Sequence, residues 1–129
     1  MKESIELKET FNTTASVMYE VWLNSLRHSH MTGGTAVCSD QVGGSFKAWD
    51  GYITGTNISL TEDQEIVQSW RTDEFESGDE DSKLTIQLRD TEGGCEFTLI
   101  HTNVPEGQAQ YKSGWEEHYF APMKIYFGE

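Results

Sequence analysis

The sequence predicts an α+β domain in which a strongly bent antiparallel sheet is covered by a long C-terminal helix. Three observations support this class. The chain has 129 residues, an ordinary length for one domain. Strand-like segments follow one another from residue 35 to 103 with connections short enough to favour antiparallel pairing. The last of these segments is followed by one long amphipathic stretch, residues 110–127. We therefore expect a single domain over residues 1–129, with sheet and helix enclosing its core.

The first elements are expected to be a strand and two short helices. Apolar and polar residues alternate over 5–11, which predicts a half-buried strand. The polar run 12–14 offers side-chain oxygens that can cap a helix. From Ala15 onward the apolar spacing becomes helical, and one face carries Met18, Val21, Trp22 and Leu26. Residues 27–34 are polar and end in two glycines, so we expect a short second helical turn followed by a loop.

Six further strands are expected, separated by turns rich in Gly, Asp and Ser. They are predicted at 35–39, 44–49, 52–60, 65–72, 83–90 and 95–103. Ile58 and Leu60 have the opposite parity to Ile53 on the same strand. A β-bulge near Gly55 would reconcile these positions and would bend the sheet.

The dipeptide Asp50-Gly51 predicts a tight hairpin, because a type I′ turn needs two residues with positive φ. The resulting register pairs Trp49 with Tyr52, Ala48 with Ile53 and Phe46 with Gly55. Two of the residues on the concave face, Ala48 and Gly55, are then too small to fill space. We expect this face to lie under the C-terminal helix.

That helix is predicted over 110–127, after Val104-Pro105 and a loop at 106–109. Its inner face is expected to carry Trp115, Tyr119, Pro122, Met123 and Tyr126. Pro122 removes one backbone hydrogen bond and should kink the helix.

Charge and composition exclude two classes of partner. The chain has 22 acidic and 9 basic residues, a formal net charge of −13. Nucleic acids and anionic membranes are bound chiefly through Lys and Arg, so neither is expected. The N-terminus lacks an apolar run, and no stretch approaches the ~20 apolar residues of a membrane span. Cys38 and Cys95 are then expected as reduced thiols in a cytoplasmic protein.

Five segments of the chain resemble one known protein family. They are GGSFKAWDGYITGTNISL, IVQSWR, LTIQL, FTLIHTNVP and SGWEEHYFAPMKIYFGE. The resemblance covers the whole chain and is to the activator of heat shock protein 90 ATPase homologue family, in particular its C-terminal domain type. This family belongs to the START-like superfamily, also called SRPBCC. The resemblance therefore implies that superfamily's helix-grip fold.

The resemblance also implies a cavity between the sheet and the C-terminal helix, because the wider superfamily binds apolar ligands there. Pockets for small ligands are mostly apolar, with a few polar anchors. The candidates for its lining are Phe46, Ala48, Ile53, Trp70, Phe97, Leu99, His101, Trp115, Tyr119 and Met123. In the alternative interpretation the same side chains touch one another and form an ordinary packed core.

His101 is the one ionisable residue among these candidates. It shares strand parity with Phe97 and Leu99, so we expect it to point inward at the end of the sheet. A neutral imidazole there can anchor a ligand or take part in acid–base chemistry, or it can be a hydrogen-bonded core residue. The sequence links no nucleophile or carboxylate to it, so no catalytic residue is assigned.

Three other motifs have simple structural explanations. The run His28-Ser29-His30 suggests metal binding, but further ligands are missing, so a polar turn and no metal site are expected. The acidic run 73–81 lacks the spacing of a calcium loop and is expected to be solvated, although it can also dock on a basic surface. Trp49 and Tyr52 stabilise the hairpin by about 0.2–1 kcal/mol if they are directly opposed, or contact a protein partner.

These expectations favour a non-enzymatic cytoplasmic domain, without a cofactor, that binds a small apolar or amphipathic ligand. The alternative is a protein-interaction module of the co-chaperone type, whose partner is a chaperone of the heat shock protein 90 class. A second alternative is an SRPBCC-type enzyme, such as a cyclase or hydrolase.

Overall fold

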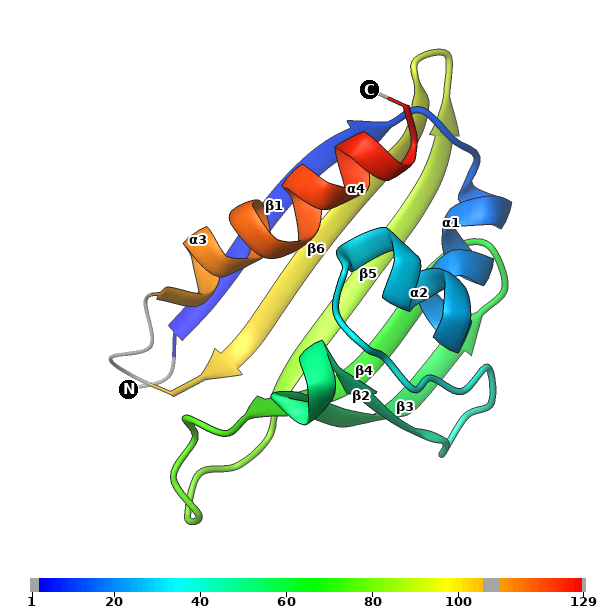
Figure 1. The fold of residues 1–129 in the computed structure, drawn as a ribbon. Coiled ribbons are helices and arrows are strands. Elements are labelled where there is room, and N and C mark those ends of the chain that lie inside the picture. The colour runs from blue at the N-terminus through cyan, green and yellow to red at the C-terminus, as the bar shows by residue number, and fades with distance from the viewer. Residues whose placement is uncertain (1–2, 106–109, 129) are drawn as a thin grey trace.

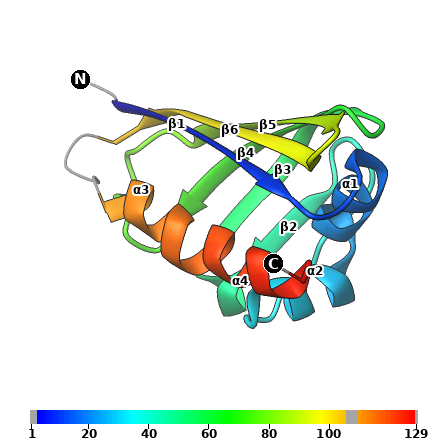
Figure 2. The same cartoon turned by 90° about the horizontal axis from the view of Figure 1, so that it is seen from above.

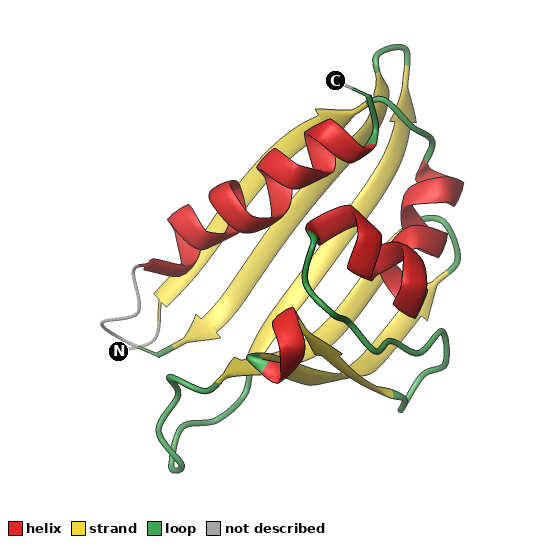
Figure 3. Cartoon of the chain, viewed as in Figure 1, coloured by secondary structure: helices red, strands yellow, loops and turns green. Residues whose placement is uncertain are grey.

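The computed structural model describes residues 3–105 and 110–128. Within them, six antiparallel strands form one sheet in the order β1-β6-β5-β4-β3-β2 (Figures 1 and 3). The strands are β1 (Glu3–Phe11), β2 (Ser45–Ala48), β3 (Ile53–Thr61), β4 (Glu65–Thr72), β5 (Ser82–Thr91) and β6 (Gly94–Val104). Their bounds match most of the predicted strands, and burial alternates along β1, β2 and β5 as the sequence pattern indicated.

The described helices lie on one face of this sheet, so the molecule has two layers (Figure 2). Helices α1 (Ala15–Leu23) and α2 (Ser25–Thr32) follow β1. The C-terminal helix consists of α3 (Gln110–Trp115), a π-helical turn η2 (Glu116–Phe120) and α4 (Ala121–Tyr126). The α+β prediction of a bent antiparallel sheet with a helix laid across it is confirmed. In the part of the chain that the structure describes, no helix is long and apolar enough to cross a bilayer.

The start of the chain follows its prediction with one error. Thr14 caps α1 by accepting a hydrogen bond from the Val17 amide, and Met18, Val21 and Trp22 are buried as expected. Leu26, however, is 66% exposed. Asn24 explains the difference, because it ends α1 in extended geometry and its side chain accepts a hydrogen bond from the Arg27 amide to begin α2. The apolar face of α1 therefore does not continue through Leu26.

Segment 35–39 does not form the predicted strand and is connected to β2 by a single isolated bridge, Val37–Lys47. The amides at two alternate positions, Ala36 and Cys38, donate to side chains of α2. The Ala36 amide donates to Ser29 Oγ at 2.8 Å, and the Cys38 amide donates to Ser25 Oγ at 2.7 Å. Two serines on one face of α2 thus tie the outer edge of this segment to the helix layer. On the edge that faces β2, Thr35 bonds to Asp50 and the Ser39 carbonyl accepts from Asn57, so the ladder does not extend beyond Val37.

The predicted bulge exists, but not at Gly55. The pairing of β3 with β4 shifts register between Asn57 and Ser59, and Ile58 is 51% exposed. Asn57 is buried, and its side-chain amide donates to the carbonyls of Ser39 (2.8 Å) and Gln41 (3.0 Å). Gly55 has a different role: a Cβ there would lie 1.9 Å from the Ser69 carbonyl oxygen, so only glycine allows this close approach of the strands.

The hairpin between β2 and β3 has the predicted register, with Phe46 opposite Gly55 and Ala48 opposite Ile53. Asp50 and Gly51 have the positive φ values, 60° and 95°, that the turn requires. Trp49 also has a positive φ, 50°, and Tyr52 is right-handed helical, so the two aromatics do not extend the strands as a directly opposed pair. Asp50 holds this geometry, because its amide donates to the Thr35 carbonyl and its carboxylate accepts from the Thr35 amide.

The C-terminal helix spans nearly the predicted range, but its inner face changes partway. Trp115, Tyr119 and Met123 are buried as predicted, whereas Tyr126 is 39% exposed. The π-helical turn places one extra residue before Pro122, which rotates the next turn by about 100°. Phe120 is therefore buried next to Tyr119. The predicted loop at 106–109 lies outside the described residues.

Candidate ligand-binding pocket

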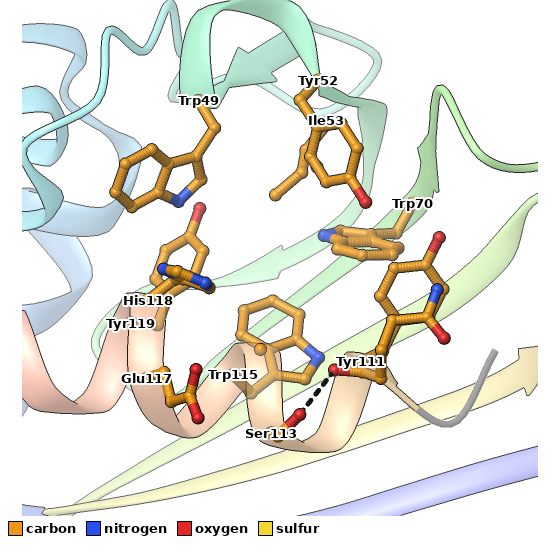
Figure 4. A pocket seen from close by; sticks show the side chains of 12 residues that line it. Trp49, Tyr52, Ile53, Trp70, Tyr111, Ser113, Trp115, Glu117, His118 and Tyr119 are labelled. Carbon is orange, nitrogen blue, oxygen red and sulfur yellow. Dashed lines mark hydrogen bonds between the residues drawn. The ribbon is translucent and has the colours of Figure 1, made fainter.

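A pocket of about 500 Å³ lies between the hairpin turn, the sheet and the start of the C-terminal helix (Figure 4). Trp49, Tyr52 and Ile53 line it from the turn, and Trp70 lines it from β4. The helix contributes Gln110, Tyr111, Ser113, Gly114, Trp115, Glu117, His118 and Tyr119. The volume falls within the range of about 300–1,000 Å³ that holds drug-sized ligands.

Trp115 is fixed by a buried hydrogen-bond chain that crosses from the helix to the sheet. Its indole N–H donates to His101 Nδ1 at 3.1 Å. His101 Nε2 must then carry the ring proton and donate to Ser82 Oγ at 2.8 Å, and the Ser82 hydroxyl donates to the Trp70 carbonyl at 2.6 Å. Burial lowers the pKa of His101 to about 4, so its imidazole is neutral at pH 7.

The same hydrogen bonds determine whether His101 can act as a catalytic base. His101 and Ser82 form a buried Ser–His pair that the sequence analysis did not identify. A general base must present an unprotonated nitrogen to the hydroxyl it activates. Here the Trp115 N–H occupies Nδ1, so the nitrogen facing Ser82 is the protonated one. The pair holds the helix against the sheet in this geometry and does not activate Ser82.

Tyr119 is fixed in the same manner by α2. Its hydroxyl donates to His28 Nε2 at 3.1 Å, while His28 Nδ1 donates to the Trp22 carbonyl at 2.9 Å. Burial lowers the pKa of His28 and raises that of Tyr119, so both groups are neutral. The predicted polar turn at 28–30 is therefore wrong for His28, which is helical and 3% exposed.

Two more tyrosines at the pocket have polar partners. The Tyr52 hydroxyl donates to Glu74, and the Tyr111 hydroxyl shares a hydrogen bond with Thr72 Oγ1. Burial is the main reason that the pKa of Tyr52 is raised, and hydrogen bonding to Glu74 contributes. These pairs hold both rings in place around the pocket.

Trp49 differs from these residues. Its ring packs on Gly34, where an added Cβ would lie 2.4 Å from the indole, and it makes edge contacts with His118 and Tyr119. Its Nε1 is buried and has no hydrogen-bond partner, the only side-chain N or O atom in that state within 3–105 and 110–128. A buried donor without a partner costs about 1–3 kcal/mol.

The structure divides the ten predicted lining residues into two groups. Ile53, Trp70, Trp115 and Tyr119 line the pocket. The others are buried outside it: Phe46, Ala48, Phe97, Leu99, His101 and Met123. The space expected at Gly55 is filled by the Phe46 ring, whose Cε2 lies 2.5 Å from the position a Cβ would take. Trp49 and Tyr52, which were expected to stabilise the hairpin or to contact a protein partner, line the same pocket.

Sequence reasoning missed the pocket residues on the first turns of the helix. Tyr111 lies four residues before Trp115, and this spacing could have placed it on the same face. The acidic segment 73–81 is mostly exposed, as expected, but it is also anchored to the sheet. Phe75 is buried against Trp70 and Tyr111, and the Arg71 guanidinium binds the Glu76 and Asp79 carbonyls and the Asp81 carboxylate.

Comparisons with known proteins converge on one family. A family model described as "Activator of Hsp90 ATPase homolog 1-like protein" matches residues 12–128. Activator of 90 kDa heat shock protein ATPase homolog 1 of Homo sapiens is 28% identical over 125 residues, which are 96% of this chain and 37% of that protein. The activator homolog of Dictyostelium discoideum is 27% identical, with 97% of this chain and 33% of that protein covered. The chain thus spans about a third of the length of these relatives.

Solved structures agree with the fold. An HSP90 activator from Plasmodium falciparum has a TM-score of 0.87 at 23% identity, over 97% of this chain and 96% of that one. The solution structure of the Aha1 dimer from Colwellia psychrerythraea has a TM-score of 0.82 at 12% identity, with 97% and 96% covered. At these identities the likeness establishes the helix-grip fold alone.

Proposed function

Because the chain belongs to the family of activator of Hsp90 ATPase homolog 1-like proteins, we propose that it is an interaction module whose partner is a chaperone of the Hsp90 class. The observation that carries the proposal is the family match over 12–128, which spans nearly the whole described fold. Relatives from Homo sapiens and Dictyostelium discoideum are named as activators of this chaperone's ATPase. From the sequence alone this role was the alternative to ligand binding, and the comparisons favour it over ligand binding.

The acidic segment 73–81 is our candidate for the docking surface. Asp73, Glu74, Glu76, Glu80 and Asp81 are exposed there, and Arg71 and Phe75 hold the segment in one conformation. A preorganised acidic surface accelerates association with a basic partner surface, and the acceleration falls with ionic strength. The segment and the β5–β6 turn project from opposite ends of the sheet (Figure 1), which provides a matched control.

The test is to titrate the Hsp90 of the source organism with this chain and to follow binding by calorimetry and ATP hydrolysis in parallel. We expect saturable binding and a change in ATPase rate. Glu80→Lys should lower the association rate, and Glu92→Lys in the β5–β6 turn should leave it unchanged. Absence of both binding and an ATPase effect would overturn the proposal. Equal behaviour of the two variants would instead reject the docking surface.

A second candidate function is the binding of a small apolar or amphipathic ligand in the pocket. The observation that favours it is the pocket of about 500 Å³ itself, which is lined largely by aromatic side chains. Preorganised walls also reduce the entropy cost of binding. Trp115 and Tyr119 are held in this way by His101 and His28.

Amide NMR shifts can test this second function with neutral aromatic compounds. Binding in the pocket should perturb Trp49, Trp115 and Tyr119 together, with a negative heat-capacity change from burial of apolar surface. Amides around Phe97 and Leu99, in the packed core, should change little. Shifts scattered over the sheet, or none at all, would exclude the pocket as a binding site.

Both proposed roles are non-enzymatic and cytoplasmic. The buried Ser–His pair is held in an unreactive tautomer, and burial raises the pKa of both Cys38 and Cys95 to about 11, so neither thiol is a ready nucleophile. Both cysteines are free, which suits a reducing compartment.

A further inference from the structure

We propose that two copies of this chain pair edge to edge through β1, in antiparallel orientation, so that their two sheets become continuous. The inference depends neither on a chaperone partner nor on the pocket. Three observations carry it: an edge with unpaired backbone groups, two charged side chains that are complementary in one register, and two apolar residues that the edge leaves half-buried.

Strand β1 ends the sheet on one side, and its outer edge is open at Glu6 and Lys8. Figure 2 shows the strand along the margin of the sheet. The Thr10 amide donates to the Glu9 carboxylate at 3.1 Å, and the Thr10 carbonyl accepts from Lys124 Nζ at 3.0 Å, so both groups point away from β6. Because backbone direction alternates along a strand, the amides and carbonyls of Glu6 and Lys8 point the same way. In the described part of the chain, these groups have no partner.

The opposite edge of the sheet is covered. There β2 is the last strand, and Val37 exchanges two backbone hydrogen bonds with Lys47, at 2.9 and 2.8 Å. Segment 35–39 therefore lies along that edge. An open edge strand is a template for pairing with another chain, and β1 is the edge of this sheet that remains open over the described residues.

The charges on β1 select one register. In a symmetric antiparallel pair centred on Leu7, Glu6 of each copy lies opposite Lys8 of the other. A pair centred on Glu6 would oppose two carboxylates, and a pair centred on Lys8 would oppose two ammonium groups. Within the described residues neither side chain forms an ion pair, so both are available to the second copy. Of these three centres, Leu7 is the attractive one.

The same register places apolar side chains together. Ile5 and Leu7 pack against the core but are only half-buried, because no strand lies beyond them. With Leu7 at the two-fold axis, the two copies of this residue form a non-hydrogen-bonded pair, the kind that brings side chains closest. Pairing would thus bury apolar surface in addition to the backbone hydrogen bonds that each Glu6–Lys8 pair exchanges.

The net charge opposes association, so the dimer should be weak. Each copy has a formal charge of −13. Repulsion between whole molecules acts over long distances and is screened by salt, whereas charges in direct contact at the edge are screened less. We therefore expect the dimer to form at high protein concentration and to be favoured by moderate salt.

Sedimentation equilibrium of the chain at increasing concentration tests the dimer. Glu6→Lys opposes two lysines at both symmetric positions and should weaken self-association about tenfold, although it lowers the net negative charge. Lys8→Glu opposes two carboxylates and should weaken it similarly. Glu62→Lys and Lys83→Glu make the same charge changes at exposed positions away from β1. The first control should not weaken the dimer, and the second should do so far less than Lys8→Glu.

Two further samples test the register. The double variant Glu6→Lys/Lys8→Glu restores opposite charges, and so does an equimolar mixture of the two single variants. Both should associate as tightly as the unmodified chain. Amide exchange at Glu6 and Lys8 should slow as the dimer forms, while exchange in segment 73–81 should not change.

A chain that stays monomeric at every concentration would overturn the proposal and show that the charges guard the edge against pairing. A dimer that neither single variant weakens would place the interface elsewhere, as would unchanged exchange at Glu6 and Lys8. Failure of the mixture to associate, after both single variants have been weakened, would reject the pairing of Glu6 with Lys8.

Discussion

The two ends of the interface between sheet and C-terminal helix use aromatic residues in opposite ways. At one end Phe11, Phe97 and Phe120 contact one another edge to face at 5.7 Å and fill the space. At the other end tryptophans and tyrosines surround a pocket of about 500 Å³. The difference lies in the indole N–H of Trp and the phenol O–H of Tyr, polar groups that Phe lacks. A ring tied by a hydrogen bond, as Trp115 is to His101, cannot collapse inward to fill a void.

The packed end should be by far the more sensitive to truncation. Phe97→Ala removes a fully buried ring and should lower the free energy of unfolding by about 3–5 kcal/mol. Tyr52→Ala, at the rim of the pocket, should lower it by about 1 kcal/mol. Urea denaturation monitored by circular dichroism measures both. Similar costs would show that the pocket end is packed in solution and would remove the distinction.

Acid should weaken the hydrogen-bond chain that holds Trp115. The folded pKa of His101 is about 4, below its usual 6.5, so the folded state resists protonation. The resulting stability is fully present above pH 6.5 and is lost as pH falls toward 4, by about 3 kcal/mol for this group. Urea midpoints from pH 7 to 4 should show this loss. The His101→Gln variant should lose less over the same range; an unchanged profile would reject the assignment.

A large residue added to the core beneath the hairpin and one added at the rim of the pocket should differ in their effects on stability. Ala48 is 2% exposed and lies outside the pocket, so Ala48→Trp should destabilise the fold by about 1–3 kcal/mol through overpacking. Ser113 is exposed on the rim, so Ser113→Trp should change stability by less than about 0.5 kcal/mol while blocking the pocket to probes. Thermal unfolding distinguishes them, and a stable Ala48→Trp protein would reveal unfilled space beneath the hairpin.

The smallest expected effect is the difference in stability between two variants that each remove one indole N–H. Trp115→Phe leaves His101 Nδ1 buried without its donor, whereas Trp49→Phe removes a donor that has no partner. The first should therefore cost at least about 1 kcal/mol more than the second. Parallel denaturation of the two variants gives the difference directly, and the reverse order would mean that the Trp49 N–H is satisfied in solution.

The sequence was most informative where one pattern determines the structure. Strand 65–72 was predicted with both ends correct, because polar turn segments bound it on both sides. Segment 35–39 reads as a strand as well, but Thr35 bonds to Asp50 and the Ser39 carbonyl to Asn57, and such distant partners cannot be read from the local pattern. The π-helical turn was not predictable, because the apolar spacing of residues 110–127 fits an ordinary α-helix nearly as well.

The site was less predictable than the fold because the pocket depends on long-range pairs. The sequence identified Trp70, Trp115 and Tyr119 as inward-facing, and they are. It could not show that His28, 91 residues from Tyr119, holds that ring in place. Nor could it show that Phe46 would fill the space at Gly55, which moved the open volume toward Trp49 and Tyr52.

The π-helical turn at Glu116–Phe120 has a consequence for the faces that the C-terminal helix presents. An extra residue in a helix decouples the angular phase of the segments on either side. Tyr111 and Trp115, before the turn, face the pocket, while Met123 is fully buried after it and the Phe127 ring contacts Phe11 at the packed end. The two halves of one helix thus serve two different environments, and each can present its own face because the extra residue lies between them.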